Sequence, residues 1–367
     1  MQGKGAEGTI RDPQPTPAGA ASGSASKDSA ELSDYMSRVV PDFWTPTMPT
    51  MMWYTPPSPP KPPPPILKKG RTNRILLYNG CFNPPHHGHL AHLKHAFRYC
   101  GTDFNVVGAV VLVAGDEYLK WKFGRNGRTE MRLSAFQRLN LWHNGLKASE
   151  GEDISNWCWV TYENDWVREV EHLEQWFKRD GFDVEFVHLA GGDKISVNSV
   201  HHGVWGCKTT VTTDISRPLD FCKGPEDKMM LPMNLRYHTP WECIPQDLEE
   251  TLKERSLLEE RYRERGFELG YDAKNLIRPV YTCTQDGRSP NTTYTLRFIA
   301  SEPSERLDPS LSSTKVRAII TEAQSLDRDC SRDTRKSRLE DRLRGVALRP
   351  DLLVGYVASG WENEGNV

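Results

Sequence analysis

Short apolar runs alternate with amphipathic segments along the middle of the chain. The apolar runs, each short enough for a buried strand, are residues 74–78, 106–113 and 184–189. The segments with apolar positions at helical spacing are residues 88–99, 128–141 and 164–179. Because the strand-like runs are continuously apolar rather than alternating, they favour a sheet covered on both faces. The pattern predicts an α/β fold with a doubly wound, mostly parallel sheet.

Two stretches interrupt this alternation. Residues 1–66 are rich in Gly, Ala, Ser and Pro and lack the apolar periodicity that would offset their ordering entropy, which predicts a disordered N-terminal tail. Residues 223–280 include a highly charged run from Leu248 to Leu269 with helical spacing, which predicts a solvated helical insertion. The insertion divides the expected domain into a first part, residues 67–222, and a C-terminal part, residues 281–367.

The composition argues against several classes of protein. A formal net charge of −2 gives no general electrostatic reason to bind nucleic acid or an acidic membrane. The eight cysteines form no C-x-x-C pair, which argues against a zinc ribbon and a disulfide framework. No apolar run approaches the roughly 18 to 20 residues of a membrane span, and residues 1–30 lack a secretory core. We therefore expect a soluble protein of the cytoplasm, the nucleus or both, with no nucleic-acid or membrane partner.

The segment richest in residues that carry chemistry is the loop at residues 79–90, N-G-C-F-N-P-P-H-H-G-H-L, which we call the histidine loop. Gly80 directly follows the first strand and lets the backbone turn and approach a ligand. Gly88 and His89 open a helix, whose unpaired N–H groups and positive dipole end favour a phosphate. His86 lies three residues before His89, so both rings can face one anion, donating hydrogen bonds or carrying partial charge near neutral pH. The loop is therefore predicted to bind phosphate.

Two other interpretations of these histidines compete with phosphate binding. The run contains five of them, at His86, His87, His89, His92 and His95. They could bind zinc, but no cysteine or carboxylate within the run completes a tetrahedral set, and the Gly-Pro framing would then need another reason. They could also be ordinary surface and helix-cap residues. We predict no protein-held metal here.

A second polar cluster lies far downstream, in the segment L-S-S-T-K-V-R that ends at Arg317. Its hydroxyl groups and its cation, at the expected start of a helix, could form another phosphate cradle. Taken alone, however, Ser-Ser-Thr is explained as well by a helix cap. Its position after the histidine loop in the chain favours the phosphate interpretation.

These two motifs resemble the signatures of one superfamily. Gly80–His89 matches G-x-F-x-P-x-H-x-G-H of the cytidylyltransferase-like nucleotidyltransferases, which have a Rossmann-like sheet, and Leu311–Arg317 looks like their I-S-S-T-x-x-R. Within the superfamily, residues 74–218 and 293–360 most resemble the eukaryotic, fungal-like nicotinamide/nicotinate mononucleotide adenylyltransferases. That resemblance implies transfer of AMP from ATP to a mononucleotide, with release of pyrophosphate and formation of NAD or its acid analogue.

The resemblance also implies an ATP site. Gly191-Gly192-Asp193 is similar to the family's G-x-D, which meets the adenosine part of ATP. The implied catalytic residues, which hold the transferring phosphoryl group and the leaving pyrophosphate, are His86, His89 and Arg317. The implied ATP contacts are Gly80, Cys81, Phe82, His86, His89, Gly191, Asp193, Ser312, Ser313, Thr314 and Arg317. A Mg²⁺ ion is expected to accompany ATP and to keep most of its waters.

Other residues match the family's mononucleotide contacts. The segment V-L-V-A-G-D-E-Y-L-K-W-K carries a lysine for the mononucleotide phosphate, either Lys120, which we prefer, or Lys122. Trp166 and Trp205 match tryptophans that contact the nicotinamide ring, and an electron-poor pyridinium stacks well on indole. Arg217-Pro218 resembles the family's R-P-G, but Leu219 replaces the glycine, which puts the local turn and the contacts of Arg217 in doubt.

Several functions remain open at this point. The two signatures fit equally a relative that uses CTP or another acceptor, such as a phosphorylated alcohol. A nucleotide-binding regulatory protein without turnover would keep the fold, although the intact histidines and Ser-Ser-Thr-x-x-Arg argue against it. A class I aminoacyl-tRNA synthetase is disfavoured because the chain is short and lacks an evident K-M-S-K-S segment. The sequence is compatible with a homo-oligomer and does not determine one.

Overall fold

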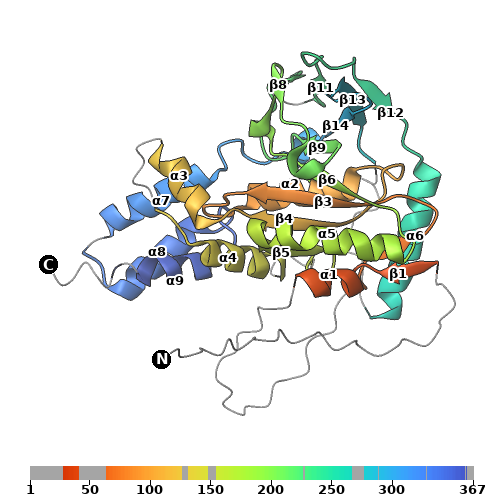
Figure 1. Cartoon of the computed structure of the whole chain (residues 1–367). Helices are drawn as coiled ribbons and strands as arrows, with labels where there is room; N and C mark the ends of the chain where they lie inside the picture. Colours follow the sequence, from red (N-terminus) through yellow and green to blue (C-terminus); the bar gives the residue numbers. More distant parts are fainter. Residues whose placement is uncertain are drawn as a thin grey trace, which may run out of the picture.

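An eight-stranded sheet runs through the middle of the molecule with helices on both faces (Figure 1). The computed structural model describes residues 28–40, 63–125, 131–147, 154–225, 228–266, 277–287, 289–327, 329–359 and 361. In spatial order the strands are β12 (Glu242–Ile244), β13 (Val280–Asp286), β14 (Thr293–Ile299), β9 (Thr209–Thr213), β6 (Val184–Leu189), β3 (Asn73–Gly80), β4 (Val106–Val113) and β5 (Cys158–Tyr162). Within this eight-stranded sheet, the β12–β13 and β13–β14 pairs are antiparallel and the other described pairs are parallel. The predicted α/β fold with a mostly parallel sheet is confirmed.

Helices bury apolar side chains on each face of the sheet. Helices α2 (His87–Tyr99) and α4 (Ala135–Lys147) pack on one face, where Leu76 and Tyr78 of β3 belong to the same apolar cluster as Leu90 and Trp142. Helices α1 (Ser33–Val39) and α5 (Glu163–Arg179) cover the opposite face, against Ile75 and Leu77. Because successive residues of a strand point to opposite faces, burial on both sides explains why β3 reads as an unbroken apolar run.

The order of the strands places a topological switch point between β3 and β6. The chain passes from β3 to β4 and β5 on one side, then returns to place β6 on the other side of β3. Connections that leave two neighbouring parallel strands in opposite directions open a crevice at their carboxyl ends, where ligands of such sheets bind. Helices α3 (Asp116–Gly124), α7 (Ser313–Leu326), α8 (Arg332–Leu343) and α9 (Pro350–Ser359) gather at one end of the sheet (Figure 1).

The N-terminal region differs in part from its prediction. Residues 1–27 and 41–62 of the predicted disordered tail lie outside the described residues. Residues 28–40, however, form β1 (Ser29–Glu31) and α1, and β1 pairs with β2 (Ile66–Lys68). Helix α1 is held because Met36 is fully buried and the Tyr35 hydroxyl donates to Asp180 at 2.8 Å. The local helical spacing of Leu32, Tyr35, Met36 and Val39 carried this signal, which the composition of the whole tail obscured.

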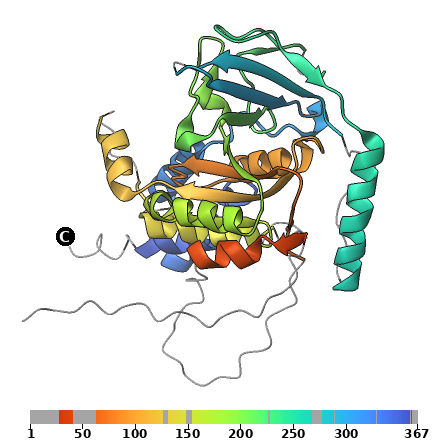
Figure 2. The ribbon, with the colours of Figure 1, turned by 45° about the vertical axis from the view of Figure 1, so that its right-hand side comes forward.

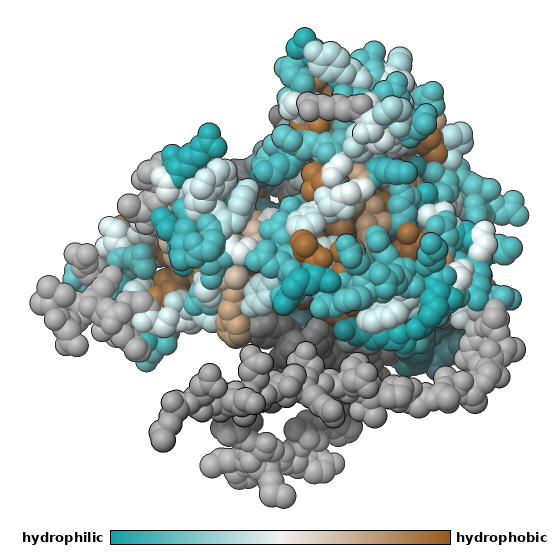
Figure 3. Space-filling view, viewed as in Figure 1, coloured by the Kyte–Doolittle hydropathy of each residue, from teal (hydrophilic) through white to brown (hydrophobic). Residues whose placement is uncertain are grey.

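The predicted insertion contains a solvated helix and more. Helix α6 (Leu248–Glu264) has no buried residue, and Figures 1 and 2 show it at the periphery of the molecule. The Glu254 carboxylate accepts from Arg71 at 2.8 Å, and the Arg261 guanidinium donates to the Pro64 carbonyl at 2.8 Å. The insertion also supplies β12, the edge strand of the central sheet. Hydrophilic residues dominate the face of the molecule seen in Figure 3.

Helix α4 starts later than the sequence pattern predicts. The apolar spacing predicted a helix over residues 128–141, but residues 126–130 lie outside the described part and residues 131–134 have no regular secondary structure. The helix begins at Ala135 and continues to Lys147. Asn83 of the loop after β3 binds the backbone of the segment that precedes the helix.

Candidate active site

The histidine loop ends in a helix cap made by the histidines themselves. His86 is the N-cap of α2, and its ring Nδ1 accepts the backbone N–H of Gly88 at 3.1 Å. The backbone N–H of His86 in turn donates to Nδ1 of His89 at 3.2 Å, and the two ring centroids lie 3.6 Å apart. This reciprocal arrangement satisfies two of the unpaired donors of a helix start. The structure therefore brings both predicted histidines together at the amino end of α2.

The same contacts determine which ring nitrogens carry protons. Since Nδ1 of His86 and Nδ1 of His89 both act as acceptors, the ring proton of each sits on Nε2. Burial, reinforced by the nearby Arg217 cation, lowers the pKa of His86 to about 3. Burial, together with His86, also holds the pKa of His89 well below its usual range. Of the two predicted roles, the lowered pKa values favour hydrogen-bond donation over partial charge near neutral pH, and each ring offers one neutral Nε2–H donor.

His92 and His95, which continue the run, belong to the core. Nε2 of His92 lies 3.0 Å from the Ala190 carbonyl and ties α2 to the end of β6. His95 is 5% exposed, and neither of its ring nitrogens has a hydrogen-bond partner among the described residues. Burial and the neighbouring Arg278 lower the pKa of His95 to about 3. These two histidines are therefore buried parts of the core.

We expect the stability of the protein to fall as the pH drops below about 6.5. Because the folded pKa of His95 lies below its unfolded value of 6.5, the unfolded chain binds the proton first, and each such histidine costs about 1.4 kcal/mol of unfolding free energy per pH unit. His95→Leu should remove about 2 kcal/mol of the loss between about pH 7 and pH 5. Urea unfolding at both pH values measures it. An unchanged pH dependence in the variant would contradict the assignment.

Gly80 leaves room for the side chain of Phe82, two residues later. A Cβ at Gly80 would lie 2.9 Å from the Phe82 ring, which folds back over the end of β3. Phe82 itself has a φ of 45°, and its ring packs edge-on against Trp142 and His89. The sharp turn predicted at Gly80 is therefore made at Phe82, while Gly80 provides the space for it. Cys81, between them, is partly exposed in the loop.

The downstream motif docks directly on the histidine loop. Ser312 is the N-cap of α7, and its hydroxyl accepts the Lys315 N–H at 3.1 Å. The Ser313 hydroxyl donates to the Pro84 carbonyl at 2.7 Å. Thus the amino ends of α2 and α7, more than 220 residues apart in sequence, meet at one loop.

Arg317 is buried in this contact. Its Nη1 donates to the Asn83 carbonyl at 2.6 Å and its Nη2 to the Thr314 hydroxyl at 3.1 Å. The guanidinium also lies over the Phe123 ring of α3, 5.2 Å from its centroid. Only 6% of Arg317 is exposed. Besides any contact with pyrophosphate, this arginine therefore holds the shape of the loop.

The glycine turn after β6 brings Asp193 and Arg217 to the same edge. Asp193 lies exposed in the short helical turn Gly192–Lys194, two residues after Gly191. The Arg217 side chain passes Gly192, where a Cβ would lie 3.3 Å from Arg217 Cγ and 2.4 Å from Leu219 Cδ2. Leu219, which stands where the resembled motif has glycine, is thus buried against Gly192. Arg217 lies close enough to lower the pKa values of His86 and His89.

The two candidate lysines occupy different sides of α3. Lys120, which the sequence analysis preferred, is paired with Glu117 at 2.6 Å, and its side chain is 60% exposed. Lys122 instead reaches the histidine loop, where its Nζ lies 3.7 Å from the Cys81 sulfur. Two residues on a helix differ by about 200° in direction, which explains the separation. The structure favours Lys122 as the lysine next to the loop.

The two tryptophans are placed less favourably for stacking on a ligand. Trp166 is 2% exposed and packs edge-on against Phe186 in the core between α5 and the sheet. Trp205 is half-buried and packs against the same cluster. The structure thus leaves Trp166 no open face, and a core position explains it.

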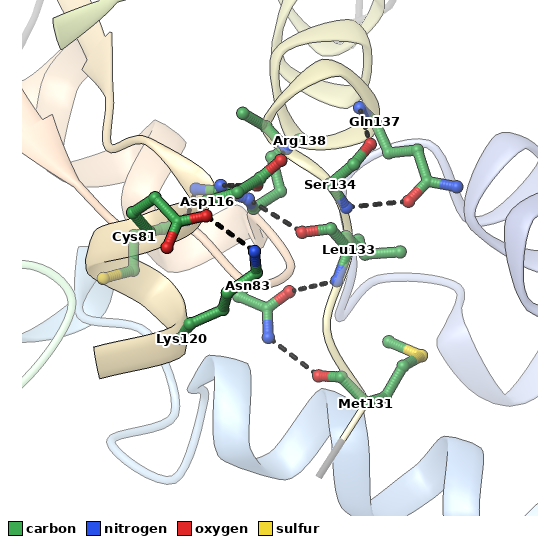
Figure 4. Close-up of polar contacts among 11 residues, drawn as sticks. Cys81, Asn83, Asp116, Lys120, Met131, Leu133, Ser134, Gln137 and Arg138 are labelled. Carbon is green, nitrogen blue, oxygen red and sulfur yellow. Dashed lines mark hydrogen bonds and ion pairs between the residues drawn. The ribbon is translucent and has the colours of Figure 1, made fainter. Parts of the chain in front are cut away.

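Two residues that no motif singled out organise the loop (Figure 4). Asn83 accepts the Leu133 N–H at 2.9 Å and donates to the Met131 carbonyl at 2.9 Å, which ties the segment before α4 to the loop. Arg138, fully buried on α4, donates to the Cys81 carbonyl at 2.8 Å. Asn83 stands at a variable position of the signature, and a helical arginine carries no local signal, so sequence reasoning missed both.

Other features of the described structure lie away from this site. A cavity of about 770 Å³ lies between α6 and residues such as Phe97 and Trp157, and none of the predicted site residues lines it. Within the described ranges, no helix combines the length and apolar character needed to cross a membrane. The eight cysteines, all of them in described segments, are unpaired.

The comparison with known families supports the chemistry that the geometry suggests. Residues 77–202 match the cytidylyltransferase-like family, and this range runs from β3 through the histidine loop to the turn that carries Asp193. No curated protein sequence matches the chain. Trp205, Arg217 and the Ser312–Arg317 motif lie outside the matched range. Residues 77–202 are therefore similar to a cytidylyltransferase-like domain, which supports nucleotidyl transfer as the general chemistry.

Proposed function

We propose that the protein is an adenylyltransferase that moves AMP from ATP to nicotinamide or nicotinate mononucleotide. The observation that carries the proposal is the meeting of two helix amino ends at the loop that bears His86 and His89. Two such ends, with the cations of Arg217 and Arg317 beside them, suit a triphosphate better than a single phosphate. The choice of ATP and of the mononucleotide rests on the resemblance of the flanking motifs.

The proposed reaction needs no covalent intermediate. A phosphate oxygen of the mononucleotide attacks the α-phosphorus of ATP, the bond to the β-phosphate oxygen breaks, and pyrophosphate leaves with that oxygen. The neutral Nε2–H groups of His86 and His89 would donate hydrogen bonds to the phosphoryl oxygens as negative charge develops. Lys122 would hold the incoming phosphate, and Arg317 would face the pyrophosphate. Catalysis would then rest on positioning and on charge stabilisation.

Mg²⁺ fits this scheme as an ion that arrives with ATP. Among the described residues, no group of three or more His, Cys, Asp or Glu side chains is arranged to hold a metal ion. Phosphate oxygens and water would therefore supply most of its ligands, as is usual for Mg²⁺ at nucleotide sites. The ion would neutralise part of the charge on the phosphates.

One observation favours a second candidate function. The burial of Trp166 removes one of the two tryptophans that pointed to a nicotinamide ring. A cytidylyltransferase-like enzyme that uses CTP, or that transfers to another phosphate monoester, needs the same histidines and helix ends but no stacked pyridinium. This candidate keeps the chemistry and changes only the substrates.

The test is pyrophosphate release by the purified protein with Mg²⁺. ATP and CTP are each offered with nicotinamide mononucleotide, nicotinate mononucleotide and a set of phosphorylated alcohols, and products are identified by mass spectrometry. We expect NAD or its acid analogue from ATP. Turnover with CTP, or with a phosphorylated alcohol only, would replace the proposal with the second candidate. Binding of ATP without turnover for any pair would indicate a regulatory protein.

A further inference from the structure

Arg138 joins three segments: the loop after β3, the residues before α4 and the start of α3. It lies on α4 with its side chain fully buried, yet a guanidinium is costly to bury unless its donors are used. Its Nε donates to the Leu133 carbonyl at 3.1 Å, its Nη1 to the Cys81 carbonyl at 2.8 Å, and its Nη2 to Asp116 Oδ1 at 2.9 Å (Figure 4). The rigid, planar fork of arginine holds these three acceptors at fixed relative positions.

Asp116 is the partner that connects this fork to α3. It is the first residue of that helix, and its Oδ1 accepts the Ala135 N–H at 2.6 Å as well as the Arg138 contact. The carboxylate therefore links the start of α3 to the start of α4. A negative charge in the first turn is also favoured by the dipole of α3.

These contacts affect the position of Lys122. This lysine is on α3, and its Nζ lies 3.7 Å from the sulfur of Cys81, the residue whose carbonyl Arg138 holds. Arg138 thus contacts the histidine loop directly and, through Asp116, orients the helix that carries the lysine. The two groups proposed to meet ATP and the acceptor phosphate are braced by one buried side chain.

We propose that Arg138 and Asp116 are positioning residues that set the distance between Lys122 and the histidine loop. The inference rests on the proposed function, in which these two elements hold the two reacting phosphates. An in-line attack requires the reacting atoms about 3 to 3.5 Å apart, and a displacement of about 1 Å can cost on the order of 100-fold in rate. Neither residue needs to touch a substrate.

The first test separates positioning from substrate binding. Asp116→Ala should lower kcat and raise the KM for the acceptor mononucleotide about tenfold or more, with the KM for ATP changed less than about twofold. Asp116→Asn keeps an oxygen at the same place and should restore most of the activity. Asp165→Ala is the matched control, because Asp165 also lies in a first helical turn beside an arginine, Arg168. Equal changes in both KM values would overturn the proposal.

The second test does not depend on turnover. A short amine-to-thiol cross-linker should join Cys81 to Lys122 in the wild-type protein, and the yield is measured by peptide mass spectrometry. Asp116→Ala and Arg138→Lys should lower that yield several-fold, whereas Asp165→Ala should not change it. An unchanged yield in Asp116→Ala overturns the positioning role whatever the activity. A reduced yield in a protein without turnover for any substrate pair supports the positioning of Lys122 and contradicts only the proposed function.

Discussion

The His86→Asn variant is expected to fold normally and to turn over about 100- to 1,000-fold more slowly than the wild type. Asparagine is a favoured N-cap and can accept the Gly88 N–H in place of Nδ1 of His86, so α2 keeps its start. The substitution removes the Nε2–H donor that we assign to the transition state. Pyrophosphate release at saturating ATP and acceptor measures the loss, and His89→Ala should show a loss of similar size.

The control for this prediction is a histidine outside the site. His172 lies exposed on α5 beside Glu169, and His172→Asn should keep the wild-type rate. The free energy of urea unfolding of His86→Asn should stay within about 1 kcal/mol of the wild-type value, because the cap is retained. A His86→Asn protein that is equally stable and turns over within about threefold of the wild type would remove His86 from the mechanism.

Arg317→Ala is expected to lose both activity and stability. The substitution leaves the buried Asn83 carbonyl without its donor, which should cost about 1 to 3 kcal/mol of unfolding free energy. It also removes a cation from the proposed pyrophosphate site, so the KM for ATP should rise and kcat should fall by about 100-fold or more. Steady-state kinetics and urea unfolding of the same preparation measure the two effects.

Two comparisons separate the structural part of this effect from the chemical part. Arg317→Lys keeps the charge but lacks the planar fork that reaches both Asn83 and Thr314, so it should recover ATP binding better than it recovers stability. Arg344, whose side chain is 70% exposed on the surface, provides the control, and Arg344→Ala should change neither quantity. A normal KM for ATP in Arg317→Ala would show that the arginine supports the loop only.

Much of the sheet could be predicted because its signals are local. The apolar runs at residues 106–113 and 184–189 coincide with β4 and β6, and α5 begins within one residue of its predicted start. The prediction of a phosphate-binding loop also rested on neighbouring residues, because Gly80, the two prolines and His86 all lie within residues 80–86. The helix predicted from residue 128 failed for a different reason. Asn83, about 50 residues earlier, binds the backbone of Met131 and Leu133, and the helix begins only at Ala135.

Side-chain direction was the information that the motifs lacked. Lys120 and Lys122 both lie in the segment that resembles the family, where Lys120 was preferred, but the orientation of α3 brings Lys122 to Cys81 and leaves Lys120 with Glu117. Trp166 matched a ligand-contacting position, but the packing of α5 on the sheet buries it. In each case the motif selected a position in the chain, while contacts with other elements decided which way its side chain points.

The sequence by itself determined the main strands of the parallel sheet and the loop that starts α2, and it indicated the general chemistry, because each depends on residues a few positions apart. The tertiary structure decided which distant groups share the site. Arg317 reaches Asn83 across 234 positions and Ser313 reaches Pro84 across 229, contacts that exist only once the strand order brings the carboxyl ends of the parallel strands together. The tertiary structure also decided the charge of His86 and His89. Burial and the nearby Arg217 cation, which no local pattern contains, lower their pKa values and keep both rings neutral.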